Sequence, residues 1–175
     1  KVKDAPTRPV SSSITPVEAT MGPYRLCFKV ASGGMGTVYL ARLESTAGFK
    51  HIVAIKRLHE WLASDSSFIE MFFDEARVAS RIAHPHVCRV TDFGIVEGRP
   101  YLAMEYLLGE SLSHVLHALR REPSLRRDPQ YLGVVVRIVA ELCQGLHAAH
   151  ELKDEFGQPL HVVHRDATPE NLFVL

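Results

Sequence analysis

The chain has 175 residues, with 20 Lys and Arg against 20 Asp and Glu, and 46% of its residues are hydrophobic. This composition is ordinary for a folded globular protein and excludes the collagen-like and disorder-dominated classes. The formal net charge of zero argues against a nucleic acid as partner, because binding to it depends on excess positive charge. Cys27, Cys88 and Cys143 lie far apart, which favours separate thiols in a reducing cytoplasm over a disulfide framework. No apolar run approaches the roughly 18–20 residues of a membrane helix.

The first part of the chain changes character at residue 24. Residues 1–23 carry several prolines, serines and threonines without a sustained apolar period, so we expect a flexible leader there. From Tyr24 onward apolar and polar residues alternate, a glycine cluster interrupts the alternation at 33–36, and the alternation resumes at Val38. The pattern predicts strand, turn and strand, and the β-branched run His51–Lys56 predicts a third strand.

Spacing of three and four residues between apolar positions then predicts a helix over Ser67–Ile82, beginning with the capping box Ser67-x-x-Glu70. The rest of the chain predicts further elements in this order: strands near Cys88–Val96 and Tyr101–Tyr106, a short helix around 112–119, a long helix over about Gln130–Leu152, and a strand at Leu172–Leu175.

Two charged residues stand out against this pattern. Glu75 shares a helical stripe with apolar residues such as Phe72 and Ala79, and an unpaired buried charge costs about 3–5 kcal/mol. Lys56 lies on an equally apolar row of its strand, so pairing Lys56 with Glu75 would satisfy both charges. The alternative is that Glu75 sits at the edge of the stripe in water, and periodicity alone does not separate the two.

The glycine cluster has two interpretations as well. Without side chains, Gly33, Gly34 and Gly36 let backbone N–H groups approach an anion such as a phosphate. A plain hairpin turn explains the same residues. The surrounding motifs decide between these interpretations.

Four motifs follow one another along the chain: Val30–Val38, Val53–Lys56, Glu75 on the next helix, and His164–Asn171. In this order and spacing they resemble the signatures of the protein-kinase family, and most closely those of its bacterial Ser/Thr members. The resemblance implies an α+β, protein-kinase-like fold: a five-stranded antiparallel N-lobe with one helix, then the first helices of a mainly helical C-lobe, ending after the catalytic loop. The expected divisions are the leader 1–23, the N-lobe and hinge 24–106, and a partial C-lobe 107–175.

The resemblance also implies ATP and Mg²⁺ as cofactors and a protein with Ser or Thr hydroxyls as substrate. Gly33, Gly34 and Gly36 would cover the phosphates, while Lys56, oriented by Glu75, would hold the α- and β-phosphates. The adenosine part would contact Val30, Val38, Ala54, the gatekeeper Met104, the backbone of Glu105 and Leu107, and Ser111.

For phosphoryl transfer the resemblance implies that Asp166 accepts the proton of the substrate hydroxyl and that Asn171 holds Mg²⁺. Asp92-Phe93-Gly94 looks like the metal-binding Asp-Phe-Gly of the family, but it precedes the catalytic loop, so we assign it to a strand. The true one is expected beyond Leu175. This chain is therefore expected to bind ATP at best, and its intact parent to transfer phosphate.

Two departures from the family pattern leave alternatives open. Ala31 replaces the usual first glycine, and Thr168 stands where Ser/Thr kinases usually carry a lysine. Both favour a pseudokinase, that is a regulatory nucleotide-binding module, as the rival interpretation, and a small-molecule phosphotransferase of related fold is a more distant one. A homodimer that phosphorylates itself and a membrane anchor beyond Leu175 are compatible with a cytoplasmic kinase domain.

Overall fold

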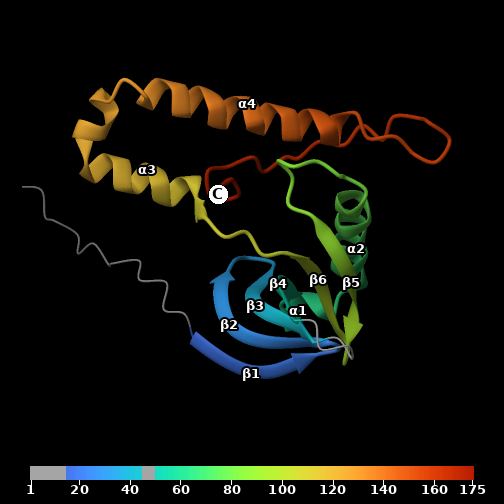
Figure 1. Cartoon of the computed structure of the whole chain (residues 1–175). Helices are drawn as coiled ribbons and strands as arrows, with labels where there is room; N and C mark the ends of the chain where they lie inside the picture. Colours follow the sequence, from blue (N-terminus) through green and yellow to red (C-terminus); the bar gives the residue numbers. More distant parts are fainter. Residues whose placement is uncertain (1–14, 45–49) are drawn as a thin grey trace, which may run out of the picture. The chain divides into compact units, whose positions relative to one another are not determined.

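The computed structural model describes residues 15–44 and 50–175 (Figure 1). Its larger sheet has six strands. Its strands lie in the order β1-β2-β3-β4-β6-β5, and β1 to β4 pair antiparallel with their neighbours. The strands are β1 (Thr15–Met21), β2 (Tyr24–Ser32), β3 (Gly36–Glu44), β4 (Lys50–Leu58), β5 (Val90–Val96) and β6 (Arg99–Glu105). The chain forms two compact units: the described residues up to Ile69 with Gly94–Ala103, and Glu70–Phe93 with Met104–Leu175.

The hydrophobic core of the first unit lies on one face of this sheet. Because successive side chains of a strand point to opposite faces, the alternate residues Tyr39 and Ala41 of β3 and Val53 and Ile55 of β4 enter the core. Ile55 and Ala103 are fully buried. The cluster consists of Met21, Tyr24, Leu26, Tyr39, Ala41, Val53, Ile55, Tyr101 and Ala103. The strands predicted from Tyr24 onward are therefore confirmed, but the alternation of burial in β2 holds at Tyr24 and Leu26 and not at Phe28 and Val30, which are 37% and 41% exposed.

The strand β1 corrects the expectation of a flexible leader over 1–23 and of a five-stranded sheet. Residues 15–21 pair with β2, and Met21, only 3% exposed, belongs to the core cluster. Gly22 has a φ of 56°, a conformation that glycine adopts readily, which permits the tight turn into β2. The apolar signal of this strand is short and interrupted by proline. Residues 1–14 of the expected leader lie outside the described residues.

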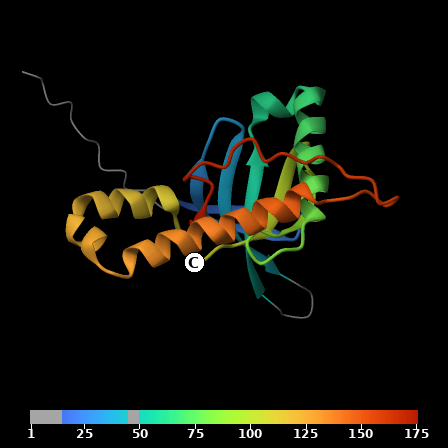
Figure 2. The same cartoon turned by 90° about the horizontal axis from the view of Figure 1, so that it is seen from above.

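The predicted helices are present, with one addition. The chain forms α1 (Glu60–Ala63), α2 (Ser66–Ser80), α3 (Leu112–Arg121), the 3₁₀ turn η1 (Pro123–Arg127) and α4 (Tyr131–His150). The short α1 was not expected from the sequence. The chain reverses its direction at η1 between α3 and α4 (Figure 2). The expected final strand is confirmed as β8 (Phe173–Val174), which pairs with β7 (Glu110–Ser111).

The helix α4 is unusually apolar, although the sequence contains no unbroken apolar run of membrane-helix length. It has 20 residues, and an 18-residue stretch of it has a mean hydropathy of 1.4, which makes it long and apolar enough to cross a membrane by length and composition alone. Its two buried residues are Gly145 and Ala149. A side chain on Gly145 would place its Cβ 2.7 Å from the carbonyl oxygen of His86. A glycine at this position therefore lets α4 approach the loop before β5 closely.

We predict opposite effects for two Gly→Ala substitutions in α4. Gly145→Ala should lower the free energy of unfolding by about 1–3 kcal/mol, because the new methyl group collides with backbone. Gly133→Ala is the matched control, since nothing lies within 4 Å of the added Cβ, and it should raise the free energy of unfolding by up to about 1 kcal/mol. Urea unfolding measures both. Equal effects of the two substitutions would contradict the packing described for Gly145.

Candidate active site

The glycine turn between β2 and β3 is closed by a hydrogen bond from the Gly33 N–H to the Gly36 carbonyl oxygen, at 2.9 Å. Gly36 is buried, and a Cβ there would collide with the carbonyl oxygen of Arg57 on β4. Gly33 and Gly34 are exposed, with no atom within 4 Å of an added Cβ. Packing therefore explains Gly36, whereas the backbone at Gly33 and Gly34 is open to a ligand.

Three of the predicted nucleotide-binding residues share one face of the sheet. Val38 on β3 is paired with Lys56 on β4, and Leu40 is paired with Ala54. Residues directly opposite each other point to the same side of a sheet, and this side is opposite to the core cluster, which contains the intervening Tyr39 and Ile55. The structure thus brings Val38, Ala54 and Lys56 together just beyond the glycine turn.

Val30 lies on β2 where the pairing with β3 is irregular. The register shifts between Lys29 and Ala31, and the Val30 side chain is 41% exposed. Ala31, which replaces the first glycine of the family pattern, is paired with Val38. Both residues therefore immediately precede the glycine turn, as the motif predicts.

Glu75 lies on α2, as predicted, but its side chain is exposed. The buried residues of α2 are Phe72 and Ala76, so the buried stripe is rotated away from Glu75. The prediction that Glu75 is a charge on a buried face is wrong. Its side chain is exposed to solvent, as expected for a residue at the edge of the apolar stripe. Pairing of Glu75 with Lys56 remains a prediction.

In the second unit, Asp166 and Asn171 of the predicted catalytic loop are held together. The Nδ2 of Asn171 donates to Oδ2 of Asp166 at 2.7 Å and to its backbone oxygen at 3.0 Å, while the Asp166 N–H donates to Nδ1 of His164 at 3.3 Å. Arg165 between them has a φ of 62°, a left-handed conformation that is uncommon for residues other than glycine. The exposed carboxylate of Asp166 is therefore held in one orientation.

The start of α3 anchors this loop. The Leu112 N–H donates to the Leu172 carbonyl oxygen at 2.7 Å, and the Ser113 N–H donates to the Pro169 carbonyl oxygen at 3.0 Å. Ser111, the predicted ribose contact, is the N-cap of α3, and its side chain accepts a hydrogen bond from the backbone of the first turn. A helix N-terminus has unpaired N–H groups, and here the catalytic loop satisfies two of them.

Thr168, at the position where Ser/Thr kinases usually carry a lysine, takes part in the hydrogen bonds that order this loop. Hydrogen bonds to Glu170 from its own backbone N–H, from Ser113 and from Thr168 hold the pKa of this carboxyl below its ordinary value. Thr168 is half-buried. Its hydroxyl thus orders the loop instead of placing a cation there.

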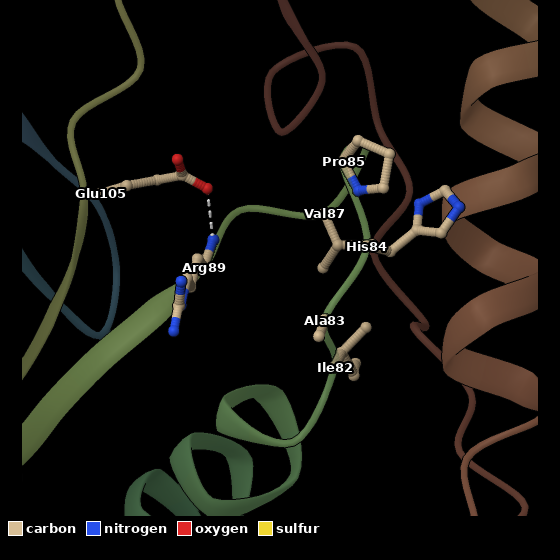
Figure 3. Close-up of a pocket in the computed structure, with 7 residues that line it drawn as sticks. All are labelled: Ile82, Ala83, His84, Pro85, Val87, Arg89 and Glu105. Atoms are coloured by element: carbon tan, nitrogen blue, oxygen red, sulfur yellow. Dashed lines mark hydrogen bonds between the residues drawn. The ribbon is translucent and has the colours of Figure 1, made fainter.

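The segment after β6 carries the predicted adenine contacts. Met104 is half-buried near the end of β6. Glu105 forms two hydrogen bonds with Arg89: its N–H donates to the Arg89 carbonyl oxygen at 2.9 Å, and its Oε1 accepts from the Arg89 N–H at 2.6 Å (Figure 3). Among the described residues the backbone of Leu107 has no hydrogen-bond partner. Leu107 therefore has a backbone donor and acceptor to offer a ligand.

A pocket of about 390 Å³ lies beside these hydrogen bonds. Its lining consists of Ile82, Ala83, His84, Pro85, Val87, Arg89 and Glu105 (Figure 3). The Sγ of Cys88 lies 3.8 Å from the carbonyl oxygen of Glu105. The sequence analysis gave Cys88 only the role of a separate thiol and did not single out Arg89, because no local pattern marks residues that contact a neighbouring strand.

The family described as the protein kinase domain matches residues 24–175. The chain belongs to the protein kinase family. Asp92-Phe93-Gly94 lies within β5 of this kinase domain, which confirms its assignment to a strand.

Individual relatives are bacterial kinases. The chain is 43% identical over 169 residues to the tyrosine-protein kinase MasK of Myxococcus xanthus, covering 96% of this chain and 26% of MasK. It is 37% identical over 153 residues to the serine/threonine-protein kinase PknE of Mycobacterium bovis, covering 87% of this chain and 24% of PknE. The chain thus spans about a quarter of the length of these relatives.

A solved structure confirms the expected fold class. The PknI kinase domain of Mycobacterium tuberculosis superposes with a TM-score of 0.65 at 27% identity, covering 91% of this chain and 57% of that chain. The fold is protein-kinase-like, with an antiparallel N-lobe sheet followed by helices. The sixth strand, β1, is the difference from the five strands expected.

We predict slow alkylation of Cys88. Burial, with a smaller contribution from the charge of Glu105, raises the pKa of the Cys88 thiol to about 11, so only about one molecule in a thousand carries the thiolate at pH 8. Iodoacetamide should label the exposed Cys143 first, and the Cys88 rate should rise about tenfold per pH unit up to pH 10. Mass spectrometry of the peptides measures both rates. Faster labelling of Cys88 than of Cys143 at pH 8 would contradict this environment.

Proposed function

We propose that this kinase domain belongs to an enzyme that transfers the γ-phosphoryl group of ATP to Ser and Thr hydroxyls of proteins. The observation that carries the proposal is the hydrogen-bonded pair Asp166 and Asn171. An exposed carboxylate held at a fixed orientation is suited to accept the proton of a hydroxyl as it attacks phosphorus. The relatives named serine/threonine-protein kinases support this specificity.

The first unit supplies the groups that suit the phosphates. The open backbone at Gly33 and Gly34 is suited to receive phosphate oxygens, and Lys56 shares a face with Val38 and Ala54 at the same end of the sheet. Phosphoryl transfer requires positioning and neutralisation of charge more than covalent chemistry. Val38 and Ala54 of this unit offer an apolar surface to adenine.

The residues present fit a bound Mg²⁺. Asn171 uses its Nδ2 on Asp166, so its amide oxygen remains as a hard ligand of the kind that Mg²⁺ prefers. When bound, Mg²⁺ neutralises charge on the phosphates. Asn171 would hold the ion, and Asp166 would orient the substrate hydroxyl.

A second candidate specificity is transfer to tyrosine. It is favoured by MasK, which is named a tyrosine-protein kinase and is 43% identical to this chain. The acceptor residue is therefore the point on which the two candidates differ.

Further parts of the proposal concern the chain as a whole. We propose that these 175 residues bind ATP without transferring phosphate, because they span only 57% of the matched PknI kinase-domain chain. A cytoplasmic location and the absence of a nucleic-acid partner remain proposals that rest on composition and a net charge of zero. A homodimer that phosphorylates itself is also a proposal.

The test uses the longer protein that contains this kinase domain, with ATP and a protein acceptor. Asp166→Asn should reduce the transfer rate at least about 100-fold, because the proton acceptor is lost. Asp92→Asn is the matched control: it changes an Asp-Phe-Gly aspartate that lies on β5, and it should retain the wild-type rate per folded molecule.

Acid hydrolysis of the phosphorylated product identifies the acceptor. Phosphoserine and phosphothreonine support the main proposal, whereas phosphotyrosine alone supports the second candidate. ATP binding without any transfer by the longer protein would favour the pseudokinase, and transfer only to a small alcohol or amine would favour the small-molecule phosphotransferase. An unchanged rate for Asp166→Asn would show that the role given to Asp166 is wrong.

A further inference from the structure

His59 contacts the glycine turn at two points, although it lies 23 positions after Gly36 in the printed sequence. It follows β4 and precedes α1. Its backbone N–H donates to the Met35 carbonyl oxygen at 3.1 Å, and its Nε2 lies 2.9 Å from the Gly33 carbonyl oxygen. A carbonyl oxygen only accepts, so Nε2 carries the proton and donates it. One residue therefore holds carbonyl groups on both sides of Gly34.

The imidazole of His59 is itself held in place by Trp61. The two rings stack with centroids 4.1 Å apart and an angle of 16° between their planes. Trp61 is 66% exposed, so its ring is not explained by burial in the core. Glu60, which lies between His59 and Trp61, connects α1 to the sheet through an ion pair with Arg99 of β6 at 2.6 Å.

Capping of α1 does not explain the imidazole. His59 is the N-cap residue of α1, yet its side chain makes no capping hydrogen bond. Its ring nitrogen is used on the glycine turn instead. The contact is therefore directed at the turn and not at the helix that follows.

The turn needs such a contact because its own sequence does little to define its shape. Glycines have the largest conformational freedom of all residues, and Gly33 and Gly34 have no packing neighbour for an added Cβ. Within the turn, a single hydrogen bond joins Gly33 to Gly36. The contacts from His59 add two further hydrogen bonds, to the carbonyls of Gly33 and Met35.

We propose that His59, oriented by Trp61, is a positioning residue that holds the glycine turn in the shape that receives the phosphates of ATP. This inference rests on the proposed function, because it assigns His59 to the same nucleotide site. It gives His59 no contact with ATP. Its effect is transmitted through the carbonyl of Gly33.

The first experiment follows the turn without nucleotide. Hydrogen exchange of the full chain should show faster exchange of the Gly33–Gly36 amides in His59→Ala. His59→Gln, whose amide can still donate to Gly33, should exchange more slowly than His59→Ala. His51→Ala is the matched control, because His51 is exposed at the opposite end of β4. Unchanged exchange in a folded His59→Ala variant would overturn the proposal.

The second experiment measures affinity by calorimetry with MgATP and with adenosine. His59→Ala should weaken MgATP binding about three- to tenfold, the effect of losing one hydrogen bond, and leave adenosine binding unchanged. His59→Gln should recover part of the loss, and His51→Ala should match wild type. An equal loss for both ligands, or no loss for either, would overturn the positioning role.

The two experiments separate this inference from the proposed function. If His59→Ala loosens the turn but the wild-type chain binds neither MgATP nor adenosine, the proposed function fails and the positioning role fails with it. If the wild-type chain binds MgATP and His59→Ala binds it equally well, the proposed function stands and the inference alone is overturned.

Discussion

The register between β3 and β4 is the constraint on which the first unit depends. Pairing Val38 with Lys56 and Tyr39 with Ile55 places the residues proposed to face the ligand and the core residues on opposite faces of one sheet. A slip of one residue would move Ile55 out of the core and Lys56 into it, because the side-chain period of a strand is two. The burial of Ile55 and Ala41 therefore fixes the place of Lys56. Gly36 makes this register possible, since only a residue without Cβ fits against the backbone of Arg57.

The glycine turn of the first unit and the predicted catalytic loop of the second unit each owe their shape to residues outside the recognisable motifs. The glycine turn is held by His59, and the catalytic loop is held by Leu112 and Ser113 at the start of α3. The left-handed Arg165 persists because these bonds fix the loop around it. In both places a flexible or strained backbone segment of the candidate site is held by residues at or next to the end of a strand or helix.

The sequence predicted those features that are local. Alternation predicted the strands from Tyr24 onward, helical spacing predicted α2 and α4, and motif order predicted the glycine turn and the loop at Asp166. Features that depend on distant contacts were not predictable in the same way. The strand β1 is defined by its pairing with β2, and the exposure of Glu75 by the rotation of α2. His59 and Arg89 act through neighbours that no sequence spacing relates to them.

Calorimetry of MgATP binding to the chain, with Lys56→Met and the exposed control Lys153→Met, tests whether Lys56 faces the phosphates. Wild type and Lys153→Met should bind MgATP alike, and Lys56→Met should bind it at least about tenfold more weakly, because a cation on this side of the sheet is lost. Equal affinity of Lys56→Met and wild type would show that Lys56 does not face the phosphates.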